Sequence, residues 1–253
     1  MANEFDLIVI GSGPGGYVAA IRAAQLGLKA AVVEKDPLFG GTCLHRGCIP
    51  TKALLHTASM LEEIRQAAGI GIDVAAPALN LEKTHGYKNQ VVSKNAKGVE
   101  FLFKKNKIQG LHGFGRLTGP HEVTVESDRG ATVYNARHIL IATGSVPRDI
   151  PIAPVDGTRI LSSDHILTLE DRVPQSMVVL GAGAVGTEFA SIYASFGTEV
   201  TLVEMLPRLL PIEDEDVSAE LEKVFRKRKI KALTETALES AEVTDSGVNL
   251  RLR

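Results

Sequence analysis

The sequence predicts an α/β fold that contains two copies of a strand, glycine turn, helix and strand unit. Three observations lead to this prediction. Residues 7–35 and 178–205 repeat one pattern at a constant offset of 170 positions, without a gap. In each copy an apolar run precedes a Gly-x-Gly-x-x-Gly motif, and apolar residues at helical spacing follow it. The hydrophobic share of 44% and the charged share of 23% are those of an ordinary globular chain.

The first copy begins with a strand at residues 7–10, and its helix ends near a C-terminal cap at Gly27, before a strand at residues 30–33. In such a unit the three glycines permit a tight turn, the approach of a pyrophosphate, and close helix–strand packing. Glu34 and Glu204 end the second strands, where a carboxylate can accept hydrogen bonds from ribose hydroxyls. A lone motif also occurs in structural loops, but two copies in register favour two dinucleotide sites.

Other elements follow from local patterns. Residues 70–80 predict a loop, and residues 81–105 predict a long amphipathic helix. Four prolines within residues 146–175 predict a crossing between domains. The C-terminal segment VTDSGVNLRLR alternates polar and apolar residues, as a hairpin strand does.

The two cysteines, Cys43 and Cys48, lie between the copies in the segment GGTCLHRGCIPTK. An inert core pair is disfavoured because glycines and polar residues surround them. Zinc is also disfavoured, because four ligands are needed and His45 and His56 offer no familiar spacing. The remaining interpretation is a redox dithiol at the start of a helix over roughly residues 49–68, whose positive end favours a thiolate. No metal site is predicted.

Charge and hydropathy exclude some partner classes. Lys+Arg 28 against Asp+Glu 30 gives a net charge of -2, so we expect neither nucleic acid nor an anionic membrane as a partner. No stretch approaches the roughly 18 apolar residues of a membrane span, and the first residues lack a signal-peptide pattern. We therefore expect a cytoplasmic chain. The basic run 225–231 follows the acidic residues 213–216 on one predicted helix, an order that the helix dipole favours.

The segment GGTCLHRGCIPTKALL resembles the active-site signature of the pyridine nucleotide-disulfide oxidoreductases. The similarity continues through VVSKNAKGVEFLFKKNKI, HGFGRLTG, HILIATGSVPRDIP and VEMLPRLLPIEDEDVSAELEKVF, in family order. Glutathione and mercuric reductases share the cysteine spacing, whereas CIPTKALL and LLPIEDED favour the members that oxidise dihydrolipoamide. The resemblance implies two Rossmann-like dinucleotide-binding domains: an FAD-binding domain with the dithiol at 1–149, and an incomplete NAD-binding domain at 150–253.

The resemblance also implies roles for individual residues. Cys43 and Cys48 would form the redox disulfide, and Lys52 and Glu188 an ion pair beside the flavin and nicotinamide rings. The expected FAD site comprises Gly11, Gly13, Pro14, Gly15, Gly16, Glu34, Lys35, Gly41, Thr42, Lys52, Gly115, Thr143, Gly144 and Ser145. The expected NAD site comprises Gly181, Gly183, Ala184, Val185, Gly186, Glu188 and Glu204. Met205 and Leu206 follow Glu204 directly, with no arginine placed to meet a 2′-phosphate, so NAD is expected rather than NADP.

The implied reaction converts dihydrolipoamide and NAD to lipoamide and NADH through the disulfide and FAD. The substrate would be carried by the lipoyl protein of a 2-oxo acid dehydrogenase complex. Family members are homodimers, and against them this sequence lacks the dimerisation domain and its His-Glu acid–base pair. Acid–base help contributes about 10²–10⁴ in rate, so we expect impaired turnover. The alternative hypotheses are a non-catalytic fragment that binds FAD and NAD, and another disulfide reductase of the family, of the glutathione or mercuric reductase type.

Overall fold

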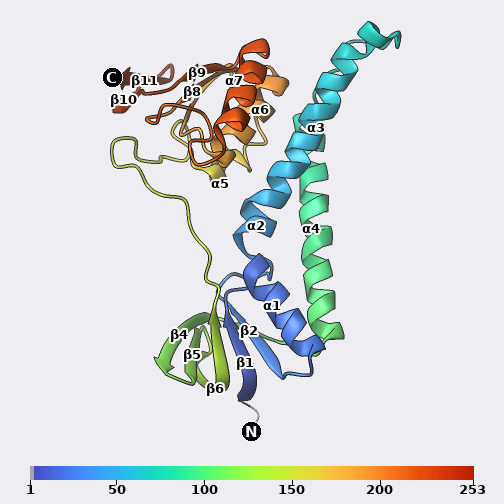
Figure 1. Cartoon of the computed structure of the whole chain (residues 1–253), viewed down its shortest axis with the longest axis vertical. Helices are drawn as coiled ribbons and strands as arrows, with labels where there is room; N and C mark the ends of the chain where they lie inside the picture. The colour runs from blue at the N-terminus through green and yellow to red at the C-terminus, as the bar shows by residue number, and fades with distance from the viewer. Residues whose placement is uncertain (1–2) are drawn as a thin grey trace. The chain divides into compact units, whose positions relative to one another are not determined.

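The computed structural model describes residues 3–253 (Figure 1). The chain divides into two compact units. The first unit holds the residues up to Pro50 together with Asn89–Val146, and the second holds Thr51–Lys88 together with Pro147–Arg253. This division does not test the boundary between an FAD-binding and an NAD-binding domain that we expect between residues 149 and 150, which stays a prediction.

The first unit contains a six-stranded sheet with the order β3-β2-β1-β6-β5-β4. Its strands are β1 (Glu4–Ile10), β2 (Ala30–Glu34), β3 (Gln109–His112), β4 (Phe114–Gly119), β5 (Glu122–Ser127) and β6 (Gly130–Ile141). The strands β3, β2, β1 and β6 are parallel to one another. The strands β5 and β4 continue the sheet in antiparallel pairing. The carboxyl ends of β1 and β6 therefore meet at one edge of the sheet.

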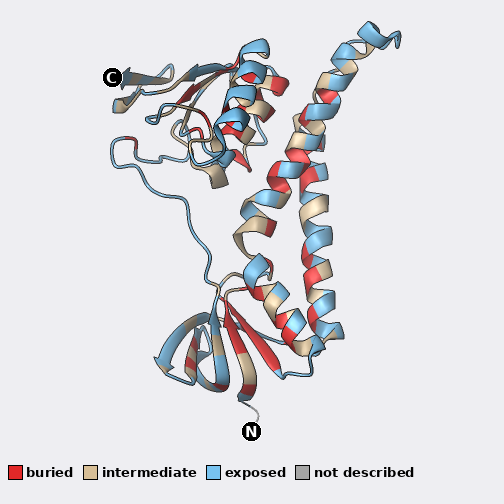
Figure 2. Ribbon diagram, viewed as in Figure 1, coloured by how far each residue is buried: buried red, intermediate tan, exposed pale blue. Residues whose placement is uncertain are grey.

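The helices of this unit are α1 (Pro14–Gln25), α2 (Gly41–Arg46), the first residues of α3 (Cys48–Gln66) and most of α4 (Leu81–Lys105). Side chains alternate across a strand, so Val9 of β1 faces a core formed with α1 and α4, whereas Ile8 and Ile10 face a second core on the other side. Figure 2 shows the resulting buried centre of the sheet along β1 and β2. The predicted helix at residues 81–105 is confirmed to the residue.

The second unit contains a parallel sheet with the order β7-β8-β9 and an antiparallel hairpin of β10 and β11. Its strands are β7 (Ser176–Leu180), β8 (Glu199–Val203), β9 (Lys231–Leu233), β10 (Leu238–Val243) and β11 (Val248–Leu252). Its helices are the rest of α3, the 3₁₀ turn η1 (Ala67–Ile70), the first turns of α4, α5 (Ser163–Ile166), α6 (Ala184–Phe196) and α7 (Glu215–Lys227). The α/β prediction, both repeated units and the C-terminal hairpin are confirmed.

The core of the second unit lies between α6, α3 and the sheet. Ile192 and Tyr193 of α6 are fully buried in one cluster with Leu54 of α3 and Leu202 of β8. The Tyr193 hydroxyl donates to the carbonyl of Ile166 at 3.2 Å, and burial raises the pKa of Tyr193 to about 12. The packing of α6 on α3 fixes the positions of these two helices relative to each other.

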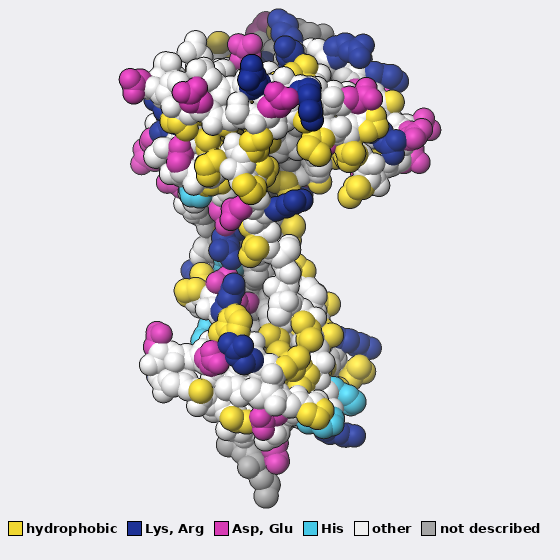
Figure 3. Space-filling model, turned by 90° about the vertical axis from the view of Figure 1, so that its left-hand side faces the viewer, with side chains coloured by type: hydrophobic (Ala, Val, Ile, Leu, Met, Phe, Trp, Pro, Cys, Tyr) yellow, Lys and Arg dark blue, Asp and Glu magenta, His cyan; other side chains and the backbone are white. Residues whose placement is uncertain are grey.

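Hydrophobic side chains are also present at the surface of each unit (Figure 3). They include Phe101, Phe114, Ile141, Met205 and Ile212. Exposed apolar side chains are common on folded chains and do not by themselves identify a binding surface. Within residues 3–253, no helix is both long and apolar enough to cross a membrane.

Candidate active site

The first glycine motif joins β1 to α1. Gly11 has a φ of +100°, and Gly13 is the N-cap residue of α1. A Cβ on Gly16 would collide with the carbonyl oxygen of Gly11, so only glycine permits this close helix–strand packing. The second motif repeats the geometry: Gly181 has a φ of +96°, and a Cβ on Gly186 would collide with the Gly181 oxygen.

Both motifs have room and free donors for an anion. An added Cβ on Gly13, Gly15 or Gly183 would meet no atom within 4 Å. Neither α1 nor α6 has a side chain hydrogen-bonded at its N-cap. Because the first amide groups of a helix lack intrahelical acceptors, they remain available to a phosphate oxygen. The residues present therefore fit the pyrophosphate of a dinucleotide at both turns.

The two acidic residues occupy equivalent places beneath the two turns. In the first copy, Oε2 of Glu34 accepts from the amide of Ser12 at 3.0 Å, and Oε1 accepts from the amide of Asp36 at 2.9 Å. In the second, Oε2 of Glu204 accepts from the amide of Ala182 at 2.8 Å, and Oε1 accepts from the amide of Leu206 at 2.9 Å. Each carboxylate thus ties the end of a strand to its glycine turn.

The carboxylate of Glu34 is buried and ionised more readily than usual. Burial raises the pKa of Glu34, but the hydrogen bonds from Asp36, Ser12 and Lys35 outweigh this effect and leave the pKa below its ordinary value. A negatively charged carboxylate is a stronger acceptor for a ribose hydroxyl than a neutral group. Glu34 is therefore suited to that role by both charge and position.

Two further segments of the first unit, residues 41–42 and residues 143–145, meet at the first glycine turn. Gly41 has a φ of +64°, and a Cβ added to it would lie 2.6 Å from the Cα of Gly13, so the turn before α2 packs directly on the glycine motif. A Cβ on Gly11 would lie 3.1 Å from the Cα of Thr143. The Thr42 hydroxyl points to the carbonyl of Ser145 at 3.5 Å. The structure thus brings these predicted site residues together.

The two cysteines form a disulfide within the first unit. Cys43 belongs to α2, and Cys48 is the first residue of α3, where the positive helix end favours a thiolate after reduction. Cys43 is half-buried and Cys48 is exposed in the protein alone. The pair therefore lies open to a bound molecule on the same short segment that packs on the glycine motif. Within residues 3–253, no three His, Cys, Asp or Glu side chains could hold a metal ion together.

An ion pair connects α3 and α6 in the second unit. Nζ of Lys52 lies 2.5 Å from Oε1 of Glu188. Lys52 lies two residues before the buried Leu54, and Glu188 directly precedes Phe189, so the core between the two helices positions the pair. The lysine side chain is 58% exposed and the glutamate side chain 27%, so both remain reachable.

The remaining predicted site residues have less specific surroundings. Pro14 and Ala184 begin α1 and α6, and Lys35 and Val185 are exposed. A Cβ on Gly115 of β4 would lie 3.0 Å from Val33, so its lack of a side chain has a packing reason. Gly144 has a φ of +71° in open space. No contact in the structure assigns these residues a ligand, and their roles stay predictions.

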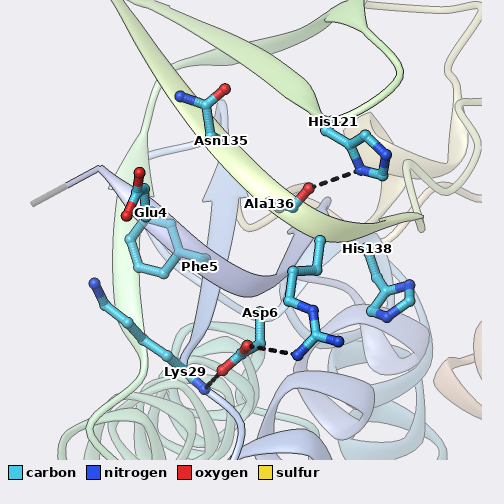
Figure 4. A pocket seen from close by; sticks show the side chains of 9 residues that line it. Glu4, Phe5, Asp6, Lys29, His121, Asn135, Ala136 and His138 are labelled. Atoms are coloured by element: carbon cyan, nitrogen blue, oxygen red, sulfur yellow. Dashed lines mark hydrogen bonds and ion pairs between the residues drawn. The ribbon is translucent and has the colours of Figure 1, made fainter. Parts of the chain in front are cut away.

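A surface hollow in the first unit lies away from this site. Its lining includes Asp6, Lys29, His121 and His138 (Figure 4). His121 is hydrogen-bonded to the carbonyl of Ala136, and Asp6 accepts from the amide of Lys29. The hollow opens at the amino end of β1, whereas the glycine turn follows its carboxyl end, about 20 Å away at 3.3 Å per strand residue. The hollow is therefore separate from the dinucleotide site.

The sequence reasoning missed two groups of residues. One is a buried cluster in the second unit, where Nζ of Lys88 donates to the carbonyl of Leu167 at 2.6 Å and lies 3.1 Å from Nδ1 of His85. Burial lowers the pKa of both side chains, the charge of Lys88 lowers that of His85 further, and Glu170 opposes both shifts. No motif identifies this cluster. The other group, Ser12 and Asp36, could have been found by asking where the two repeats differ.

Comparison with known proteins places this arrangement in a family. The profile described as "Pyridine nucleotide-disulphide oxidoreductase" matches residues 5–252. A dihydrolipoyl dehydrogenase of Zymomonas mobilis is 45% identical over 253 residues, which are all of this chain and 54% of that protein. A leghemoglobin reductase of Vigna unguiculata is 41% identical over 99% of this chain and 48% of its own length. The chain spans about half the length of these curated relatives.

Solved structures agree with the sequence matches. The crystal structure of LpdA from Mycobacterium tuberculosis has a TM-score of 0.89 and 28% identity, covering 97% of this chain and 55% of that one. The flavoprotein disulfide reductase RclA from Escherichia coli has a TM-score of 0.82 and 26% identity, covering 99% of this chain and 53% of that one. With its glycine turns, its disulfide and a family profile that spans nearly all its residues, the chain belongs to the pyridine nucleotide-disulphide oxidoreductase family.

Proposed function

We propose that the chain is the dinucleotide-binding part of a flavin-dependent disulfide oxidoreductase that couples the oxidation of dihydrolipoamide to the reduction of NAD. The observation that carries the proposal is the Cys43–Cys48 disulfide on a segment packed against the first glycine motif through Gly41 and Gly13. A redox dithiol next to a dinucleotide turn is the arrangement that electron transfer between a disulfide and a flavin requires.

Members of the family use FAD and NAD(H). We assign FAD to the first motif, because Glu34 and the disulfide lie in the same unit as that turn. We assign NAD to the second motif, where Glu204 holds the equivalent place. Lys52 and Glu188 would then border the reacting rings. The division into an FAD domain at 1–149 and an NAD domain at 150–253 belongs to this proposal.

The chemistry of the chain's own residues is thiol–disulfide exchange. A thiolate of dihydrolipoamide attacks Sγ of Cys43, the Cys43–Cys48 bond breaks, and Cys48 leaves as a thiolate at the start of α3. The second substrate thiol displaces Cys43 from the mixed disulfide, which closes lipoamide and leaves two reduced cysteines. FAD, when bound, supplies the two-electron transfer from the reduced pair to NAD. The substrate would arrive on the lipoyl protein of a cytoplasmic 2-oxo acid dehydrogenase complex.

A second candidate function is a non-catalytic FAD- and NAD-binding fragment. The observation that favours it is that the chain spans about half the length of its curated relatives. Such a fragment would keep both nucleotide sites and the disulfide but would not turn over lipoamide.

One assay separates the two candidates. The chain, loaded with FAD, is given NADH with lipoamide or with an artificial electron acceptor, and Cys43→Ser is the matched control. The proposal expects NADH oxidation with both acceptors, and Cys43→Ser to lose only the reaction with lipoamide. Binding of FAD without NADH oxidation by the unaltered chain with either acceptor would favour the non-catalytic fragment. Failure to bind FAD at all would overturn both candidates.

A further inference from the structure

The carboxylate of Glu34 is connected to both ends of the short dithiol helix α2. One connection runs from its Oε2 atom through Ser12 to Gly40, the residue before α2. The other runs from Oε1 through Asp36 to Arg46, the last residue of α2. Since Cys43 lies inside α2, the residue proposed to bind ribose and the redox sulfur share one hydrogen-bonded network.

The connection through Ser12 is fully buried. The Ser12 hydroxyl donates to Oε2 of Glu34 at 2.5 Å and accepts from the amide of Gly40 at 3.0 Å, and Ser12 has no exposed surface. A hydroxyl that donates to a carboxylate becomes a better acceptor, so the two bonds strengthen each other. Movement or a new hydrogen bond at Glu34 is therefore transmitted to the backbone at the start of α2.

The connection through Asp36 is closer to solvent. Its amide donates to Oε1 of Glu34, and its Oδ2 atom lies 3.0 Å from the guanidinium of Arg46. The two side chains are 36% and 45% exposed, so water and salt weaken this pair. We therefore expect it to contribute less than the Ser12 connection.

The second repeat provides an internal comparison. It keeps the two backbone bonds to its carboxylate, from Ala182 and Leu206 to Glu204. These residues stand at the positions of Ser12 and Asp36, but Ala182 has no hydroxyl and Leu206 no carboxylate. The side-chain connections therefore occur only in the copy that is followed by the dithiol, although the turn itself forms without them.

Helix α2 depends on such external bonds. It has six residues, and no side chain caps its N-terminus. Helices this short are not stable by themselves, because too few internal bonds offset the ordering of the backbone. Its other attachments include Gly41 against Gly13, the bond between His45 and the carbonyl of Phe39, the contact of Thr42 with Ser145, the buried side chain of Leu44 and the disulfide to Cys48. The position of Cys43 is thus decided by contacts that α2 makes with its surroundings.

We propose that Ser12 and Asp36 are positioning residues that couple nucleotide binding at Glu34 to the reactivity of Cys43. This inference rests on the proposed function, because it takes Glu34 as the ribose acceptor. Glu34 accepts three hydrogen bonds from Ser12 and Asp36, and the backbone of Lys35 is a further donor to it. A ribose hydroxyl that binds this carboxylate immobilises it and tightens both ends of α2.

The test uses ADP, which contains the ribose and the pyrophosphate but no flavin ring to shield the sulfurs. The full chain is reduced, and the rate of iodoacetamide alkylation is measured at Cys43 by mass spectrometry with and without ADP. Ser12→Ala and Asp36→Leu place at each position the residue that the second repeat carries, so the turn can still fold. Ala182→Ser is the matched control, and calorimetry measures ADP binding by each variant.

We expect ADP to slow alkylation of Cys43 in the unaltered chain by about threefold or more, the size of effect that one hydrogen bond produces. The quantity compared is the ratio of the Cys43 alkylation rate without ADP to the rate at saturating ADP. We expect this ratio to fall to about one in Ser12→Ala, to fall partly in Asp36→Leu, and to stay unchanged in Ala182→Ser. A purely structural role of Ser12 would raise both rates and keep the ratio, and that result would overturn the inference alone. Absence of ADP binding by the unaltered chain would overturn the proposed function and the inference with it.

Discussion

Replacing Glu34 by glutamine tests whether the acidic residue organises the first nucleotide turn. The side chain keeps its size, but one oxygen becomes an NH₂ group. In the protein Oε2 accepts two hydrogen bonds from Ser12, and Oε1 accepts one from Asp36. In one orientation of the new amide its NH₂ group faces the donors of Ser12, and in the other it faces the backbone N–H of Asp36.

The size of the loss can be worked from these three bonds. A hydrogen bond to a charged acceptor contributes about 1.5–3 kcal/mol, and a neutral one about 1 kcal/mol. Glu34→Gln removes at least one charged bond and makes the others neutral, so we expect the free energy of unfolding to fall by about 3 kcal/mol. Glu204→Gln is the matched control. Glu204 accepts two bonds and is only partly buried, so its loss should be about 1 kcal/mol.

The effect should depend on pH with a defined sign. Because the folded-state pKa of Glu34 is lowered, its stabilisation is complete above the unfolded glutamate pKa of about 4.3 and is lost as the pH falls through the lower folded value. The difference between the unaltered chain and Glu34→Gln should therefore shrink in acid.

Urea unfolding followed by circular dichroism suits this chain, which has no tryptophan. Hydrogen exchange of the β1 and β2 amides restricts the measurement to the first unit. A loss no larger than that of Glu204→Gln, or a difference that stays constant from neutral to acid pH, would refute the reasoning.

Three further predictions concern the dithiol, the second nucleotide site and the buried cluster. In the reduced chain with FAD bound, Cys43 should be alkylated faster than Cys48. Without FAD, the exposed Cys48 should also react readily. Peptide mapping that finds Cys48 alkylated faster in both states contradicts this prediction. Glu204→Ala should bring the affinities for NADH and NADPH closer together in binding titrations, because the carboxylate of Glu204 repels a 2′-phosphate. An unchanged ratio of the two affinities would show that Glu204 does not contact the ribose. Burial, together with the charge of Lys88, lowers the pKa of His85, so the unfolded chain takes up a proton at this residue at higher pH than the folded chain. The free energy of unfolding should therefore decline as the pH falls below about 6.5, and His85→Gln should flatten that decline in urea midpoints; an equal slope in the variant counts against this prediction.

Local patterns were sufficient for much of the fold. The helix at residues 81–105 and the C-terminal hairpin form where their periodicity places them, because each signal lies within a few turns or one strand pair. The division into compact units was not visible in this way. Residues 51–88 group with a segment that starts about a hundred positions later, because Leu54, Ala58 and Leu61 are buried against α6.

The candidate site likewise contains residues that local sequence signals predict and residues that they do not. The glycine turns were recognisable because a Cβ at Gly16 or Gly186 is sterically excluded, which requires glycine at a fixed spacing in the sequence. No such spacing requirement identifies Ser12. Its importance comes from Glu34 and Gly40, which the chain brings to it from 22 and 28 positions away.

By itself, the sequence determined the two βαβ repeats, the position of the cysteine pair and the resemblance to a redox family, since these depend on residue type and short spacing. The family resemblance alone led us to expect the pairing of Lys52 with Glu188, 136 positions apart, and the structure shows their contact. Only the tertiary structure decided the burial of His85 with Lys88. It also decided the connection of Glu34 to both ends of α2. Hydrogen bonds and ion pairs between distant segments depend on angstrom-scale packing of the elements between them, and that packing is a property of the whole fold rather than of any window of sequence.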